Sequence, residues 1–149
     1  MTWTLSLNLQ TDPDALRAVR RMIYAIVQQE GLPESEAREL ELAIGEALSN
    51  ARTRAYSTCA GPLTVDITSD PAAVEVAIHD TGAPISLPTV PASLPSDPRA
   101  VGLFVIASLV DDVTIQRNGN GKGVSIAMTK RFRQTHKSPA NEPKRGRTT

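Results

Sequence analysis

The most constraining feature of this sequence is two pairs of short segments in which apolar and polar residues alternate. The pairs are 63–69 with 74–80, across Asp70-Pro71, and 112–117 with 123–130, across Asn118-Gly119-Asn120-Gly121. Alternation is typical of a strand with one buried face, and a short polar turn between two such strands predicts an antiparallel hairpin. A further alternating segment at 3–9 predicts another strand. The chain is therefore restricted to a mostly antiparallel sheet with one apolar face.

Three helices are predicted to cover that apolar face. The first begins at Asp12-Pro13, since aspartate suits the N-cap and proline the first helical position, and it ends near Gly31. The second covers about 33–56, and the third is a short apolar segment at 99–110. The order β-α-α-β-β-α-β-β predicts an α+β two-layer sandwich, with three helices on one face of a mostly antiparallel sheet.

Length and charge set the domain organisation and exclude several classes of protein. The 149 residues suggest one domain, which we place at 1–132, followed by a basic and disordered tail at 133–149. Sixteen basic residues balance sixteen acidic ones, and aromatic residues make up only 3%, which argues against direct nucleic-acid binding. The single cysteine and the lack of an apolar run of about 20 residues predict a cytoplasmic protein without a membrane span.

Polar side chains that could take part in catalysis or ligand binding lie along one edge of the second predicted helix. Glu46, Asn50 and Arg54 are spaced four residues apart, so they share one face beside the apolar stripe. A carboxylate there could accept a proton from a nucleophile, and an amide oxygen could bind a hard cation such as Mg²⁺. The spacing alone fits the wet polar edge of an amphipathic helix at least as well.

Two weaker signals lie at the two ends of a proline-rich segment, 81–98, which is long for a loop inside a compact domain. Asp80-Thr81-Gly82 ends a predicted strand, where an acid could accept a ligand hydrogen bond; an ordinary turn is the alternative. Gly102-Leu103 lies at the predicted start of the third helix, where free N–H groups could bind phosphate. A lone glycine is weak support for such a site.

In this order the motifs resemble the GHKL ATPase superfamily, and more closely its RsbW-type anti-sigma factor serine-protein kinases. The segment ELELAIGEALSNARTRAY is similar to the first family motif, HDTGAPI to the second and RAVGLFVIASLVDDVTI to the third. The resemblance covers roughly residues 5–132 and implies a Bergerat-type ATP-binding fold.

The resemblance implies a role for each motif residue. Glu46 would be the general base that activates a partner's serine hydroxyl, and Asn50 would hold Mg²⁺ at the ATP phosphates. Asp80 would bind the adenine amino group, with Gly82 letting the base lie close to the backbone. The remaining nucleotide-binding residues would be Arg54, Gly102 and Leu103, and the segment 83–100 would be the lid.

The implied function is an ATP-dependent kinase that regulates transcription. It would phosphorylate a serine of an anti-anti-sigma protein of the STAS type and would sequester a sigma factor, with a homodimer expected from the family. Ala83-Pro84 and Ala100 depart from the glycines of the family pattern. These departures keep open an alternative: a non-catalytic partner-binding module of the same fold, with weak or lost ATP binding.

Overall fold

The computed structural model describes residues 1–57, 59–82, 89–118 and 122–133. Five strands form one sheet in the spatial order β1-β2-β3-β5-β4, and every neighbouring pair is antiparallel. The strands are β1 (Trp3–Gln10), β2 (Pro62–Ser69), β3 (Ala73–Asp80), β4 (Asp112–Arg117) and β5 (Val124–Arg131). Both hairpins predicted from alternation, β2–β3 and β4–β5, are confirmed.

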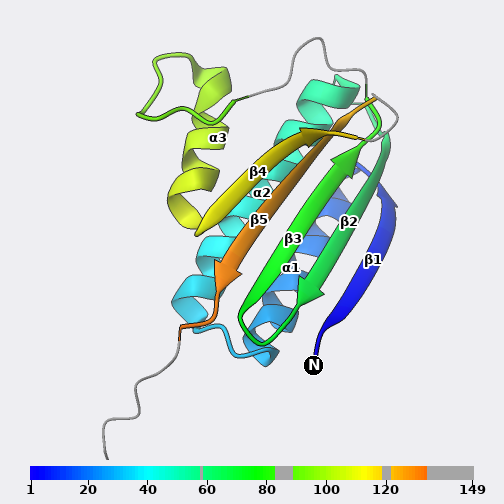
Figure 1. Cartoon of the computed structure of the whole chain (residues 1–149). Coiled ribbons are helices and arrows are strands. Elements are labelled where there is room, and N and C mark those ends of the chain that lie inside the picture. The colour runs from blue at the N-terminus through cyan, green and yellow to red at the C-terminus, as the bar shows by residue number, and fades with distance from the viewer. Residues whose placement is uncertain (58, 83–88, 119–121, 134–149) are drawn as a thin grey trace, which may run out of the picture.

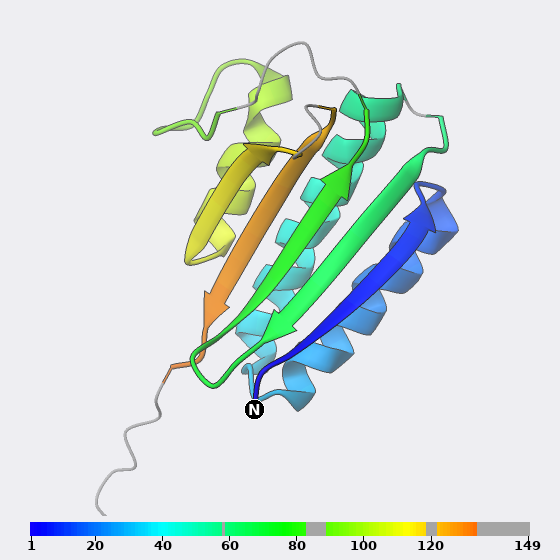
Figure 2. The same ribbon diagram turned by 45° about the vertical axis from the view of Figure 1, so that its right-hand side comes forward.

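Three helices lie on one face of this sheet and leave the other face uncovered (Figures 1 and 2). They are α1 (Pro13–Gln29), α2 (Glu34–Tyr56) and α3 (Pro98–Leu109). The long α2 lies between the other two helices and contacts both of them. The predicted α+β two-layer sandwich is therefore confirmed.

Local signals in the sequence explain where α1 begins and ends. The Asp12 side chain accepts a hydrogen bond from the N–H of Ala15 (3.0 Å), and Pro13 occupies the first helical position. The side-chain contact pairs one of the backbone N–H groups that the first turn of a helix otherwise leaves without a partner, and proline has no N–H group to pair. Gly31 follows the helix with φ +109°, a conformation that glycine adopts without steric cost.

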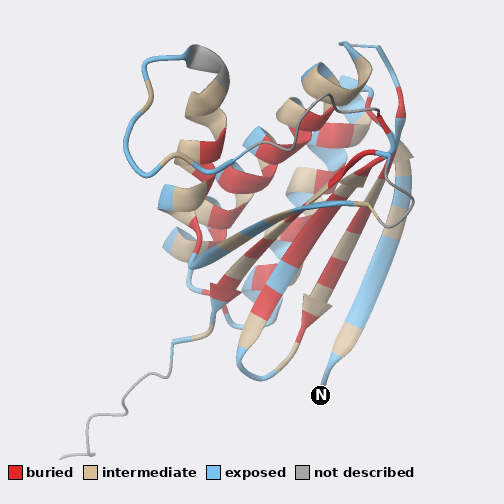
Figure 3. Ribbon diagram, turned by 45° about the horizontal axis from the view of Figure 1, so that its top comes forward, coloured by how far each residue is buried: buried red, intermediate tan, exposed pale blue. Residues whose placement is uncertain are grey.

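The core lies between the helices and the apolar face of the sheet, and it is aliphatic. Along β2 the residues Leu63, Val65 and Ile67 are buried, whereas the intervening residues are half-exposed. Figure 3 shows the buried residues along the surfaces where sheet and helices meet. The largest fully buried side chains include Ile23, Leu40, Ile44, Leu48, Ile78, Ile106 and Met128.

Two predictions concern residues outside the described part of the chain. The predicted tail lies there from residue 134 onward, and so do residues 83–88 of the predicted lid. Of the described remainder of that predicted lid, residues 89–97 form neither helix nor strand, whereas residues 98–100 belong to α3. Among the described residues, no helix is long and apolar enough to cross a membrane.

Candidate functional site

The polar edge of α2 lies beside the residues that pack the helix against the sheet. Ala43, Ala47 and Ala51 are fully buried, and their small side chains let the helix lie close to the sheet. Glu46 is exposed and Asn50 is half-buried, one helical turn further along. The helix therefore presents the two predicted chemical groups beside the core.

Helix α3 lies across this edge and brings Gly102 against both groups. A Cβ atom at Gly102 would lie 2.8 Å from Asn50 Nδ2 and 3.3 Å from Glu46 Oε2. The hydrogen side chain of Gly102 is thus what permits α3 to approach so closely. The structure brings Glu46, Asn50 and Gly102 together, although 52 residues separate Asn50 from Gly102 in the sequence.

The predicted place of Gly102 and Leu103 at the start of this helix is wrong. Helix α3 begins at Pro98, so that Gly102 is its fifth residue. The free N–H groups of a helix belong to its first turn, and Gly102 lies beyond that turn. Proline favours the first helical position, and Ala100 continues the helix, its N–H donating to the Asp97 carbonyl (3.0 Å). Leu103 is only 7% exposed and packs in the core.

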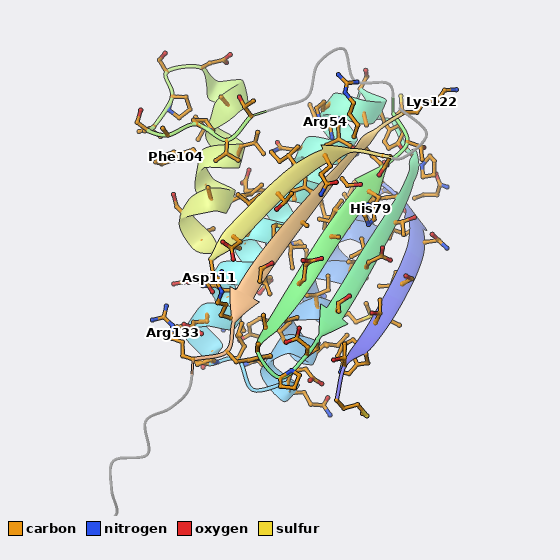
Figure 4. All side chains as sticks on the ribbon, viewed as in Figure 1. Arg54, His79, Phe104, Asp111, Lys122 and Arg133 are labelled. Atoms are coloured by element: carbon orange, nitrogen blue, oxygen red, sulfur yellow. The ribbon has the colours of Figure 1, made fainter. Side chains whose placement is uncertain are left out.

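Asp80 ends β3 as a buried carboxylate that accepts three hydrogen bonds. Its side chain is 2% exposed. Oδ1 accepts from the backbone N–H groups of Gly82 and Val124 (3.2 Å each). Oδ2 accepts from Arg54 Nη2 (2.5 Å), and Figure 4 shows Arg54 at the end of α2. Buried charge is tolerated when it is paired in this way, and the carboxylate ties β3, β5 and α2 together at one point.

Gly82 contacts α2 directly. A Cβ atom at this position would lie 2.5 Å from Ala55 Cβ and 2.7 Å from Ala55 Cα. No side chain larger than hydrogen fits there without movement of the strand end or the helix. The glycine that, by the family resemblance, would let a bound base lie close to the backbone therefore also fixes the distance between the end of β3 and the last turn of α2.

Gly123 approaches Asp80 from the other side, and sequence analysis did not assign it to the site. Its φ is +83°, and a Cβ atom there would lie 1.9 Å from the Asp80 carbonyl oxygen. A glycine that directly precedes a strand is a sequence signal for close backbone approach. The pairing of the β3 end with the β5 start explains why this glycine is needed.

Replacing Gly123 with alanine is expected to lower the free energy of unfolding by at least about 2 kcal/mol, because strain at positive φ adds to a backbone clash. Urea denaturation measures this change. The matched control is Gly31→Ala. Gly31 also has positive φ, but among the described residues beyond its chain neighbours no atom lies within 4 Å of the place that a Cβ would take. A loss no larger than in the control would contradict a specific contact with Asp80.

Tyr56 is a second residue that sequence analysis did not place in the site. Its hydroxyl donates to the Pro62 carbonyl (2.5 Å) and accepts from the N–H of Thr81 (3.0 Å). Its ring lies so close to Gly61 that a Cβ there would be 2.3 Å from Tyr56 Cδ1. Tyr56 thereby holds the end of α2 against the segment that follows Asp80.

Comparison with known proteins agrees with this fold. The family model of the histidine kinase-like ATPase domain matches residues 9–130. The chain is 25% identical to the serine-protein kinase RsbW of Bacillus velezensis, over 85% of this chain and 84% of that protein. The crystal structure of the RsbU and RsbW domains of Rv1364c from Mycobacterium tuberculosis has the same fold, with a TM-score of 0.63 and 20% identity. That similarity covers 87% of this chain and 32% of the Rv1364c chain. Because the family model spans most of its length, this chain belongs to the histidine kinase-like ATPase family, and its similarities fit the RsbW type.

Proposed function

We propose that this protein is an ATP-dependent protein-serine kinase of the anti-sigma type. It would transfer phosphate to a serine of an anti-anti-sigma protein and would hold a sigma factor in an inactive complex. The observation that carries the proposal is the arrangement along α2. Glu46 and Asn50 lie against Gly102 of α3, while Arg54, on the same edge, reaches the buried carboxylate of Asp80.

This arrangement supplies two ends of a nucleotide site. Eight residues separate Glu46 from Arg54, which is about 12 Å along a helix axis. The base of ATP would bind at the Asp80 end, where a buried carboxylate can accept a hydrogen bond from an amino group. The phosphates would then lie along α2 toward Asn50, with the terminal phosphate near Glu46.

The chemistry requires positioning and one proton transfer. Glu46 is exposed and would take the proton of the incoming serine hydroxyl. The serine oxygen then bonds to the terminal phosphorus as the bond from that phosphorus to the β-phosphate oxygen breaks, and ADP leaves. Phosphoryl transfer depends on placing these groups more than on covalent chemistry by the protein.

The side-chain oxygen of Asn50 would hold Mg²⁺, which neutralises phosphate charge when bound. Among the described residues, no group of three or more His, Cys, Asp and Glu side chains could hold a metal ion. That finding fits Mg²⁺, because this ion is commonly held by one or two protein ligands together with substrate phosphates and water.

The proposed partners are a sigma factor and an anti-anti-sigma protein of the STAS type. The RsbW kinase to which the chain is similar supports a protein substrate. Binding to a sigma factor would place the protein in the cytoplasm and give it a role in transcription regulation. A homodimer and the absence of direct nucleic-acid binding stay predictions.

A second candidate function is a partner-binding module that does not turn over ATP. The specific observation in its favour is that both oxygens of the Asp80 carboxylate already accept hydrogen bonds, one of them from Arg54. In addition, Gly102 lies inside α3 instead of offering a free N–H group at its start. Nucleotide affinity separates the two candidates.

Isothermal titration calorimetry with ATP, in Mg²⁺ and in EDTA, tests the proposal. We expect micromolar binding, roughly −8 kcal/mol, that weakens strongly without Mg²⁺. No heat of binding at millimolar ATP would reject the kinase and favour the partner-binding module. GTP is the control ligand, because its base presents a carbonyl where adenine presents an amino group.

A further inference from the structure

Polar side chains form a continuous hydrogen-bonded chain across the uncovered face of the sheet. On β2, Asp66 accepts from Ser6 of β1 through Oδ1, and its Oδ2 lies 3.0 Å from His79 Nε2 on β3. His79 Nδ1 lies 2.5 Å from Ser125 Oγ on β5. Ser125 Oγ in turn donates to Asn118 Oδ1. Figure 4 shows His79 on the sheet, near the end of β3.

The last member of this chain contacts the proposed nucleotide site. Asn118 Nδ2 donates to the backbone carbonyl oxygen of Asp80, at 2.5 Å. The side-chain carboxylate of Asp80 is the group that we propose to bind the base of ATP. The uncovered face of the sheet and the nucleotide site on the helix side therefore meet at one residue.

All contacts of this hydrogen-bonded series can be made at once in only one protonation state of His79, because each contact needs one donated hydrogen. Ser125 has a single hydroxyl hydrogen, and Asn118 Oδ1 can only accept, so the contact between them uses that hydrogen. Nδ1 of His79 must then donate to Ser125 Oγ. Nε2 must also donate, because its partner Asp66 is a carboxylate. Both ring nitrogens carry hydrogen only in the imidazolium form.

In the neutral form the same contacts compete. Nε2 keeps the single ring hydrogen, because without it Nε2 and the Asp66 carboxylate would be two acceptors 3.0 Å apart. Nδ1 then becomes an acceptor, and it competes with Asn118 Oδ1 for the one hydrogen of Ser125. Either the His79–Ser125 contact or the Ser125–Asn118 contact is then lost. Loss of the second one frees the Asn118 side chain, which holds the Asp80 carbonyl.

We propose that His79, Ser125 and Asn118 are positioning residues for Asp80, and that protonation of His79 strengthens nucleotide binding. The inference rests on the proposed role of Asp80 in binding the base. Among the described residues, Asp66 is the charged group that faces His79 from β2, and Glu75 lies on the same face of β3 itself. From β5 the facing partner is the uncharged Ser125.

Calorimetric titration with Mg·ATP at pH 6 and pH 8 tests the coupling. We expect the affinity of the wild type to fall about five-fold between these values, the effect of one lost hydrogen bond. ATP itself also titrates in this range, so the variant sets the baseline. In His79→Gln the residual pH dependence should be that of ATP alone.

The chain offers a matched control, since it contains one other histidine, His136. His136→Gln should keep the pH dependence of the wild type. Asn118→Ala should weaken binding and reduce the pH dependence to that of ATP alone, whereas a merely structural role would weaken binding equally at both pH values. Circular dichroism verifies that each variant is folded.

The outcomes separate the coupling from the proposed function. No ATP binding by the wild type at either pH would overturn the proposed function and the coupling with it. ATP binding that depends on pH as strongly in His79→Gln as in the wild type would overturn the coupling alone. Equal loss of affinity at both pH values in Asn118→Ala would also overturn it.

Discussion

Replacing Glu46 with glutamine is expected to slow phosphate transfer by at least about 100-fold, because glutamine cannot accept the serine proton. The affinity for ATP should change little. The side chains have nearly the same shape, and Glu46 is exposed at the edge of α2, so neither packing nor the base-binding end is altered. Transfer of labelled phosphate from ATP to a serine-containing STAS-type protein is the rate to measure.

Glu75→Gln is the matched control for this variant. Glu75 is also an exposed glutamate, but it lies on β3 between the buried Val74 and Val76, on the face of the sheet that the helices leave uncovered. Its replacement should leave the transfer rate unchanged. If Glu46→Gln retained full transfer, Glu46 would not be the base. If it lost ATP binding together with transfer, its role would be in binding and not in proton transfer.

Replacing Asn50 with alanine is expected to weaken Mg²⁺-dependent ATP binding by at least about 10-fold, the scale on which changes around a metal ion act. The affinity measured in EDTA should be nearly unchanged, because the lost oxygen would contact the cation and not the base. Calorimetry in Mg²⁺ and in EDTA separates these two contributions.

Asn8→Ala serves as the control, since Asn8 is an exposed asparagine of β1 that accepts from Thr64 Oγ1 (2.9 Å). It should bind Mg·ATP like the wild type. Equal losses in Mg²⁺ and in EDTA for Asn50→Ala would contradict a metal role. They would indicate instead that Asn50 supports the contact between α2 and α3 at Gly102.

Local sequence signals were sufficient to predict the secondary structure and the layered fold. The alternation in β2 through β5, the cap at Asp12 and the stop at Gly31 all act over a few residues, and each is confirmed. Helical periodicity likewise placed Glu46, Asn50 and Arg54 on one edge of α2. The third helix was predicted to within one residue at each end, but Gly102 was wrongly placed at its free N–H groups, because it is the fifth residue of α3.

The contacts within the site required the tertiary structure. The approach of Gly102 to Asn50, and of Arg54 to Asp80, depends on how α3 and the sheet pack against α2. Sequence spacing carries no information on such distances between elements. The roles of Tyr56 and Gly123 were missed for the same reason, since both depend on contacts with residues near the end of β3.

The sequence by itself therefore determined which residues become helix or strand and which side of each element is polar, because backbone geometry repeats over two or about four residues. Only the tertiary structure decided which polar groups meet. The chain from Asp66 through His79 to Ser125 exists because three strands pair in one register, and a slip of one residue would turn these side chains to the other face.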